Sequence, residues 1–235
     1  MLIPYLAYAR KERRTQPRDP VNTRYVARLE ASGADRVVAL DVHSPAAFDN
    51  AFSVPTDHLS ALPMMADHFS SRLGTAPVTV VSPDVGGIKR AQLFQELLEQ
   101  ASGRPVELAF LEKRRALGKV NTGRLVGEIE GRVALVIDDL CATGGTLVGA
   151  ADRCREAGAV AVHAAVTHAP LPAGLDAVAR ADSISDVLVT DSVGALRRSG
   201  KIRTLSVAPL LGEAVKRMVC GTPVAPLLAG WPPDS

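Results

Sequence analysis

The fold is decided by the stretch Val133-Ala-Leu-Val-Ile-Asp138-Asp139-Leu-Cys-Ala-Thr143-Gly144-Gly145-Thr146. An apolar run ends in two adjacent carboxylates, a turn rich in glycine and threonine follows, and the pattern beyond it predicts a helix over residues 145–157. Continuous apolar runs of this length are typical of strands that are covered on both faces of a parallel sheet. Ligands of such sheets bind where the strands end, so this turn is the first place to look for function.

The turn has the chemistry of an anion site. Gly144 and Gly145 allow the backbone to turn tightly and to aim N–H groups inward, and Thr143 and Thr146 add hydroxyl donors. The amino end of the following helix contributes the positive end of its dipole. We therefore expect this turn to bind a phosphate dianion.

The two acids before the turn need a different explanation. Asp138 and Asp139 would repel a phosphate, but they can accept hydrogen bonds from sugar hydroxyls or approach a metal ion. A phosphorylated sugar satisfies both ends of the motif. An ordinary strand-to-helix turn with an aspartate cap would account for only one acid and one glycine.

Working outward, other segments repeat the alternation of strand and helix. Helix-length amphipathic stretches occupy residues 21–31, 59–73 and 88–100, and in the first of them Val21, Tyr25 and Leu29 share one face. Short β-branched runs predict further strands at residues 36–41, 78–82, 106–111, 160–167 and 186–190. This alternation predicts an α/β protein with parallel sheets.

Two more of these strands end in polar residues suited to chemistry. Asp41 and His43 follow the first strand, and Ser82 and Asp84 follow the second. Three other histidines, His58, His68 and His163, lie within or beside apolar patterns, and we interpret them as structural.

Composition excludes several classes of partner. Apolar residues make up 47% of the chain and charged residues 22%, which is the balance of a folded globular protein. The formal net charge is only +2 and aromatic residues make up 4%, so neither nucleic acid nor a membrane surface is an expected partner. The anion that binds should be small.

Cysteine use and the amino terminus indicate the compartment. The three cysteines, Cys141, Cys154 and Cys220, show no metal or redox spacing, which fits a reducing environment. The segment over residues 1–14 runs from apolar to basic, the reverse of a signal peptide, and no apolar run is long enough to cross a bilayer. We expect a cytoplasmic protein.

At this point the sequence resembles a known family. Residues 138–146 look like the phosphoribosyl-pyrophosphate loop of type I phosphoribosyltransferases and of ribose-phosphate pyrophosphokinases. The order of the other motifs resembles the pyrophosphokinases and spans nearly Met1 to Leu211. Those motifs are Tyr8-Ala-Arg-Lys-Glu-Arg-Arg14, Pro17-Arg-Asp-Pro20, Asp41-Val-His43, Ser82-Pro-Asp-Val-Gly-Gly87 with Arg90-Ala91, Lys113-Arg-Arg115 and Thr167-His168.

The resemblance implies an activity and a set of roles. The family makes phosphoribosyl pyrophosphate for nucleotide biosynthesis by moving pyrophosphate from ATP to ribose 5-phosphate, with Mg²⁺, and it assembles as homo-oligomers, dimers or hexamers. Lys113 and Arg115 would be catalytic. The remaining expected sites are Arg10, Lys11 and His43 for ATP, His43 and Asp84 for the metal, and Asp138, Asp139, Ala142, Thr143, Gly144, Gly145 and Thr146 for ribose 5-phosphate.

Read without the family, each of these segments also has a plainer interpretation. Charged residues fill six of the nine positions from Arg10 to Arg18, which is typical of a solvated segment, and Lys113 with its neighbours could simply be a basic loop. A histidine such as His43 is an unusual ligand for a hard cation, so Asp84 is the more natural choice.

The resemblance also predicts domains and leaves two other functions open. We expect two type I phosphoribosyltransferase-like domains, at residues 1–75 and 76–220, with a tail at 221–235. The first domain should be incomplete, because the family normally has a further amino-terminal stretch with a loop that reaches the ATP site. Ala142 stands where the family usually has a third aspartate, which resembles a transferase-style loop. The alternatives are thus a phosphoribosyltransferase and a non-catalytic partner of a full-length pyrophosphokinase.

Overall fold

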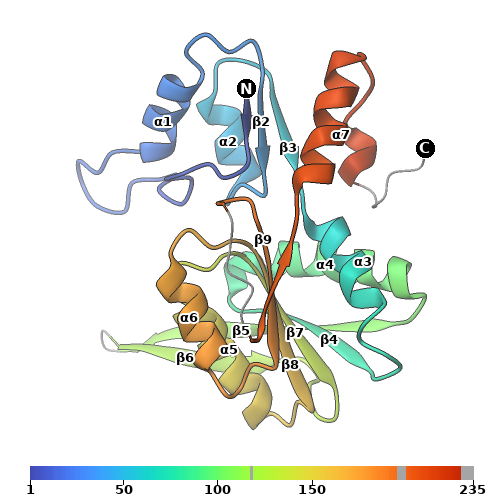
Figure 1. Ribbon diagram of the computed structural model, residues 1–235. Helices are drawn as coiled ribbons and strands as arrows, with labels where there is room; N and C mark the ends of the chain where they lie inside the picture. The colour runs from blue at the N-terminus through green and yellow to red at the C-terminus, as the bar shows by residue number, and fades with distance from the viewer. Residues whose placement is uncertain (117–118, 195–199, 229–235) are drawn as a thin grey trace. The chain divides into compact units, whose positions relative to one another are not determined.

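The computed structural model describes residues 1–116, 119–194 and 200–228, except for the side chains of residues 113–116 and 119–122. The chain forms two compact units. Unit 1 comprises Met1–Ala61 and Ala208–Leu228. Among the described residues, unit 2 comprises Leu62–Val207. Figure 1 labels most of the helices and strands of the two units.

Unit 1 is built on a small parallel sheet. Its three strands, β1 (Leu2–Ile3), β2 (Val37–Leu40) and β3 (Thr56–Leu59), lie in that order. The helices α1 (Asn22–Glu30), α2 (Pro45–Ala51) and α7 (Ala208–Val219) belong to the same unit, as does the short helix η2 (Ala225–Leu228). Apolar residues from β2, α1 and α2 form one buried cluster, in which the rings of Phe48 and Phe52 lie 5.0 Å apart.

Helix α1 buries a different face from the one that its apolar pattern suggests. Tyr25 and Leu29 are 60% and 77% exposed, whereas Thr23 and Ala27 are buried. The smaller side chains allow the helix to approach the rest of the cluster closely, and the Thr23 hydroxyl donates to backbone carbonyls of Tyr8 and Ala9. Periodicity located the helix correctly but did not indicate which stripe faces inward.

Unit 2 contains a seven-stranded sheet in the order β10-β9-β8-β7-β4-β5-β6. All neighbours are parallel except β5 and β6, which form an antiparallel pair. The strands are β4 (Val78–Ser82), β5 (Val106–Ala116), β6 (Lys119–Val126), β7 (Val133–Leu140), β8 (Ala161–His168), β9 (Asp186–Thr190) and β10 (Ile202–Leu205). The expected α/β class with mainly parallel sheets is confirmed.

Helices cover both faces of this sheet. On one side lie α3 (Leu62–Ser70) and α4 (Ile88–Ser102), and on the other lie α5 (Gly145–Glu156) and α6 (Pro172–Arg180), as Figure 1 shows. Ala134 and Val136 of β7 pack with Leu147 of α5, whereas the alternate residues Leu135 and Ile137 are buried toward the opposite face. A strand buried on both faces reads as a continuous apolar run, as the sequence predicted.

The strand order of unit 2 places a switch point between β4 and β7. From β4 the chain crosses to β5 on one side, and from β7 it crosses to β8 on the other. Because these parallel crossovers run in opposite directions, their helices lie on opposite faces, and the loops after β4 and β7 diverge. Ligands of open parallel sheets bind at such points.

The compact units divide the chain differently from the expected bounds at residues 75 and 220. The predicted helix over 59–73 is split, because Thr56–Leu59 forms strand β3 and only Leu62–Ser70 is helical. Helix α3 groups with unit 2, where the rings of Phe69 and Phe94 lie 6.5 Å apart. At the other end, Leu227 is buried within a segment that was expected to be tail. The functional domain bounds stay a prediction.

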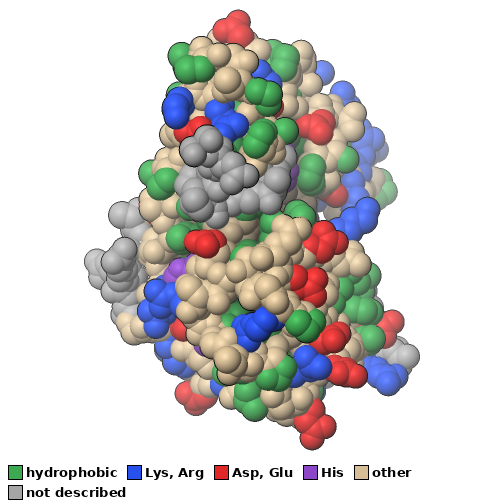
Figure 2. All heavy atoms as spheres, turned by 90° about the vertical axis from the view of Figure 1, so that its right-hand side faces the viewer, with side chains coloured by type: hydrophobic (Ala, Val, Ile, Leu, Met, Phe, Trp, Pro, Cys, Tyr) green, Lys and Arg blue, Asp and Glu red, His purple; other side chains and the backbone are tan. Residues whose placement is uncertain are grey.

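The distribution of surface charge and the length of the helices are relevant to possible binding partners. Lys and Arg side chains and Asp and Glu side chains both occur across the face shown in Figure 2, in keeping with a net charge of +2. Within residues 1–116, 119–194 and 200–228, no helix is long and apolar enough to span a bilayer.

Candidate functional site

The loop after β7 is open where an anion would bind. Gly144 is buried and is the N-cap of α5, with φ of +80°, a left-handed conformation that favours glycine. No described side chain caps this helix end. Thr143, Gly145 and Thr146 are exposed, so these three residues are not buried by packing.

A second glycine supports this loop from outside the motif. A Cβ atom on Gly144 would lie 2.5 Å from the carbonyl oxygen of Gly174, in the first turn of α6. Likewise, a Cβ atom on Gly174 would lie 2.4 Å from the carbonyl oxygen of Ala142. The two backbones therefore touch, and only glycine fits at either position. Sequence reasoning missed Gly174, whose only signal was its place in a proline-containing turn.

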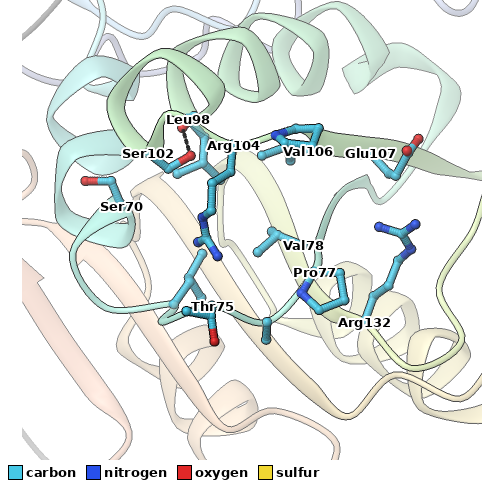
Figure 3. Close-up of a pocket in the computed structure, with 13 residues that line it drawn as sticks. Ser70, Thr75, Pro77, Val78, Leu98, Ser102, Arg104, Val106, Glu107 and Arg132 are labelled. Carbon is cyan, nitrogen blue, oxygen red and sulfur yellow. Dashed lines mark hydrogen bonds between the residues drawn. The ribbon is translucent and has the colours of Figure 1, made fainter.

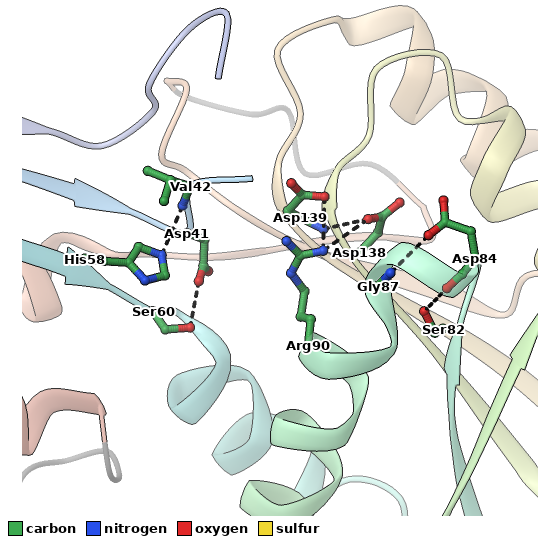
Figure 4. Close-up of polar contacts among 10 residues, drawn as sticks. All are labelled: Asp41, Val42, His58, Ser60, Ser82, Asp84, Gly87, Arg90, Asp138 and Asp139. Carbon is green, nitrogen blue, oxygen red and sulfur yellow. Dashed lines mark hydrogen bonds and ion pairs between the residues drawn. The ribbon is translucent and has the colours of Figure 1, made fainter. Parts of the chain in front are cut away.

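The acidic pair lies at the end of β7 and is bridged by an arginine of α4. Nη1 of Arg90 is 3.2 Å from Oδ1 of Asp139 and 3.6 Å from Oδ1 of Asp138, as drawn in Figure 4. The backbone N–H of Asp139 also donates to Oδ1 of Asp138 at 2.9 Å. The two predicted sugar-binding acids are thus close together beside the loop, and the guanidinium of Arg90 in α4 contacts both of them.

Burial and charge determine how the pair is ionised. Asp139 is 5% exposed and the Asp138 side chain is 19% exposed. Desolvation raises the pKa of Asp138, and the neighbouring Asp139 carboxyl raises it further, while Arg90 opposes the rise. At neutral pH the two carboxyls therefore hold a proton more readily than two isolated aspartates would.

Cys141, inside the loop, is not a nucleophile. Burial and the nearby Asp138 raise the pKa of its thiol to about 11. A thiol is a poor nucleophile until it ionises. The cysteine instead contributes to the core, where it is 1% exposed.

The neighbouring turn, after β4, is closed by its own side chains. Oδ1 of Asp84 accepts a hydrogen bond from the N–H of Gly87 at 3.1 Å, and the Ser82 hydroxyl donates to the carbonyl of Asp84 at 2.7 Å. Asp84 is thereby the N-cap of the short helix η1 (Val85–Gly87), which leads into α4. The predicted metal ligand has a structural task as well.

In unit 1, the segment after β2 is attached to the end of β3. Asp41 is buried with φ of +39°, and its carboxylate accepts from the Ser60 hydroxyl at 2.6 Å and from the N–H of Ala61 at 3.0 Å. Nε2 of His58 accepts from the N–H of Val42 at 3.1 Å, which gives this histidine the structural role expected of it. His43 follows as an exposed side chain.

The basic segment predicted to bind ATP shows two different environments. Arg10 is exposed. Lys11 donates to Oδ2 of Asp19 at 2.7 Å and to the Thr15 hydroxyl at 2.9 Å. These contacts hold the pKa of Asp19 well below its usual range, chiefly through Lys11. An ATP contact by Lys11 would have to compete with this ion pair.

The predicted catalytic residues fall in the β5–β6 hairpin. The backbone of Lys113 and Arg115 belongs to β5, where Arg115 pairs with Val120 of β6. Their side chains lie outside the described residues, so their catalytic role stays a prediction.

The chemistry of the donors fits a metal that is shared with substrate. The described residues contain no group of three or more His, Cys, Asp or Glu that could hold a metal ion by itself. Mg²⁺ is commonly bound by one or two carboxylates together with substrate phosphates and water. Asp84, at the end of β4, is a suitable carboxylate. His43 belongs to unit 1, so its part in the same metal site stays a prediction.

A separate pocket lies away from these residues. Its volume is about 360 Å³, and it is lined by the starts of β4 and β5, including Val78 and Val106, together with Arg104 and Arg132 (Figure 3). These residues are at the amino ends of the strands, opposite to the loop and the acidic pair. The pocket is therefore not the candidate site.

Comparisons with known proteins show the family of this chain. Residues 119–228 match the family model described as phosphoribosyl synthetase-associated domain. A ribose-phosphate pyrophosphokinase of Maricaulis maris is 42% identical over 224 residues, covering 92% of this chain and 69% of the relative. Ribose-phosphate pyrophosphokinase 1 of Streptococcus pneumoniae is 36% identical, covering 97% and 70%.

A solved structure extends the likeness to three dimensions. The phosphoribosylpyrophosphate synthetase of Mycobacterium smegmatis superposes with a TM-score of 0.82 at 30% identity, covering 94% of this chain and 71% of that one. The likeness thus covers more than nine tenths of this chain and more than two thirds of each of these relatives. The chain belongs to the ribose-phosphate pyrophosphokinase family.

Proposed function

We propose that this chain is a ribose-phosphate diphosphokinase, which transfers pyrophosphate from ATP to ribose 5-phosphate and releases AMP. The observation that carries the proposal is the open loop at Gly144, which lies beside the acidic pair Asp138 and Asp139 at the switch point of the sheet. One end of this arrangement suits a phosphate dianion and the other suits sugar hydroxyls. Family membership supplies the reaction.

Each part of the sugar phosphate has a place. The 5-phosphate accepts hydrogen bonds from N–H groups of residues 143–146 and from the hydroxyls of Thr143 and Thr146, aided by the α5 dipole. The ring hydroxyls donate to Asp138 and Asp139. Ala142 contributes only its backbone, because its methyl group has no polar atom. The sugar is then oriented with its 1-hydroxyl toward ATP.

The transfer step needs positioning and charge neutralisation. The oxygen of the ribose 1-hydroxyl attacks the β-phosphorus of ATP, the bond from that phosphorus to the oxygen bridging it to the α-phosphorus breaks, and AMP leaves with that oxygen while the hydroxyl proton is lost. Lys113 and Arg115 place positive charge near the oxygens on which charge develops. Arg10, Lys11 and His43 would bind ATP, and Asp84 would hold a Mg²⁺ ion, which would supply positive charge to the phosphates.

The direct test is product formation. The protein is incubated with ATP, ribose 5-phosphate and Mg²⁺, and AMP and phosphoribosyl pyrophosphate are measured by chromatography. We expect both products in equal amounts, and neither without the sugar phosphate. A folded protein that makes no AMP would contradict the proposal.

The same preparation separates the alternatives. Consumption of phosphoribosyl pyrophosphate that requires a nucleobase would identify a phosphoribosyltransferase. This alternative is suggested by Ala142, which makes the loop resemble that of a transferase. Co-purification with an active pyrophosphokinase, without turnover by this chain alone, would identify a non-catalytic partner. The family comparisons favour neither outcome over the diphosphokinase.

A further inference from the structure

Arg90 connects two elements that meet at the candidate site. It is the third residue of α4, and its guanidinium reaches the acidic pair at the end of β7, 49 residues away along the chain. One nitrogen, Nη1, approaches a carboxylate oxygen of each aspartate, at 3.2 Å and 3.6 Å. The Arg90 side chain is only 19% exposed, so the contact is shielded from solvent.

The pair needs such a cation. Asp138 and Asp139 are adjacent and shielded, so two ionised carboxylates there would repel each other strongly, and a nearby cation favours the ionised form. Arg90 opposes both the desolvation of Asp138 and the repulsion from Asp139. A guanidinium also restricts the rotation of the carboxylates that it contacts, because its N–H groups point in fixed directions.

We propose that Arg90 is a positioning residue for ribose 5-phosphate, and that it holds Asp138 and Asp139 in the orientation in which they accept the sugar hydroxyls. This inference rests on the proposed function. In this proposal Arg90 acts through the aspartates, because Asp138 and Asp139 are its ion-pair partners. The two acidic side chains are then already ordered in the free protein, so less conformational entropy is lost when the ligand binds.

The test is ligand binding by three variants of the full chain. Calorimetry measures the Kd for ribose 5-phosphate in Arg90→Met, Arg90→Lys and Lys89→Met. We expect Arg90→Met to weaken binding about tenfold, the loss of one charge-assisted hydrogen bond, and Arg90→Lys to recover part of it. Lys89 is exposed and next in sequence, so Lys89→Met controls for the loss of one positive charge and should bind normally.

A double-mutant cycle separates positioning from direct contact. In an Asp139→Asn background, the effect of Arg90→Met on the Kd should be clearly smaller than in the unmodified chain, because one of the two partners of Arg90 is already changed. An undiminished tenfold loss in that background would mean that Arg90 touches the ligand and would overturn the inference. Equal binding by Arg90→Met and the unmodified chain would also overturn it. Circular dichroism checks that each variant is folded, and Arg90→Lys serves if Arg90→Met is not.

Kinetics add a readout that a purely structural role would not move. In Arg90→Met the KM for ribose 5-phosphate should rise about tenfold while the KM for ATP stays within about twofold. Equal rises in both would contradict a positioning role. Failure of the proposed function is recognised separately, since an unmodified chain that binds ribose 5-phosphate but forms no AMP would refute the diphosphokinase activity while the calorimetric cycle still decides the role of Arg90.

Discussion

The turns after β4 and β7 begin from adjacent, parallel strands and both lead into a helix, but only the turn after β4 contains a side-chain cap. After β4, the carboxylate of Asp84 accepts from the N–H of Gly87 and caps the short helix η1. After β7, the N-cap is Gly144, which has no side chain. Helix α4 itself also begins from a glycine N-cap, Gly87, without a side-chain cap, so the difference between the two turns is the hydrogen bond from the Gly87 N–H to Asp84 just before α4.

The comparison also shows what keeps the open turn in shape. Side-chain hydrogen bonds from Ser82 and Asp84 hold the β4 turn. The loop after β7 instead packs against the backbone of α6, where Gly144 contacts Gly174. Because α6 contacts the loop at Gly144, the exposed residues Thr143, Gly145 and Thr146 stay accessible to a ligand.

Gly144→Ala should abolish most of the activity. The new Cβ would meet the Gly174 carbonyl oxygen at 2.5 Å, and alanine is strained at a φ of +80°. We expect kcat/KM for ribose 5-phosphate to fall at least about 100-fold, because displaced donors no longer match the phosphate. Steady-state AMP formation measures it. Gly131→Ala is the matched control, since Gly131 has a φ of +71° with no atom within 4 Å of the added Cβ, and activity there should be retained.

Gly174→Ala tests the support from behind. Its Cβ would lie 2.4 Å from the Ala142 carbonyl oxygen, so α6 or the loop must shift. We expect the KM for ribose 5-phosphate to rise about tenfold, with a smaller change in the KM for ATP. Gly212→Ala, in helix α7 with nothing within 4 Å, should leave both constants unchanged and raise thermal stability slightly. If the two variants behave alike, the glycine contact does not support the loop.

Asp84 can be tested for its two roles separately. Asparagine is as good an N-cap as aspartate but carries no charge, so Asp84→Asn should keep its stability and need severalfold more Mg²⁺ for half-maximal activity. Asp84→Ala should lose the cap as well, at about 1 kcal/mol in the free energy of unfolding. Magnesium titrations and urea unfolding measure the two effects. An unchanged magnesium requirement in Asp84→Asn would exclude it as a metal ligand.

The smallest expected effect concerns pH. The folded-state pKa of Asp138 is raised from an ordinary 3.8 to about 8, mainly by desolvation. Between these values the folded state binds a proton that the unfolded state lacks, so this group's contribution to stability is present below the lower value and is lost as pH rises through the upper one. Asp138→Asn should therefore decline less in stability than the unmodified chain between about pH 5 and 9. Urea unfolding across that range measures it, and parallel declines would contradict the shift.

Much of the open turn was predictable from the sequence. The apolar strand, the acidic pair and the glycines follow one another without a gap, and each has a local preference that needs no distant partner. Six strands were predicted, at β2, β4, β5, β7, β8 and β9, and the structure has all six. Strand β3 was missed because Asp57 and His58 interrupt its apolar pattern.

From the sequence alone we could predict the acidic strand end, the turn rich in glycine and threonine, and the helix after it, because backbone conformation there is set by neighbouring residues. Only the tertiary structure decided that Arg90 faces Asp138 and Asp139, that Gly174 lies behind Gly144, and that α1 buries Ala27 and not Leu29. These contacts join residues that are far apart in the chain or depend on which surface a helix meets. They follow from strand order and packing, which no local pattern encodes.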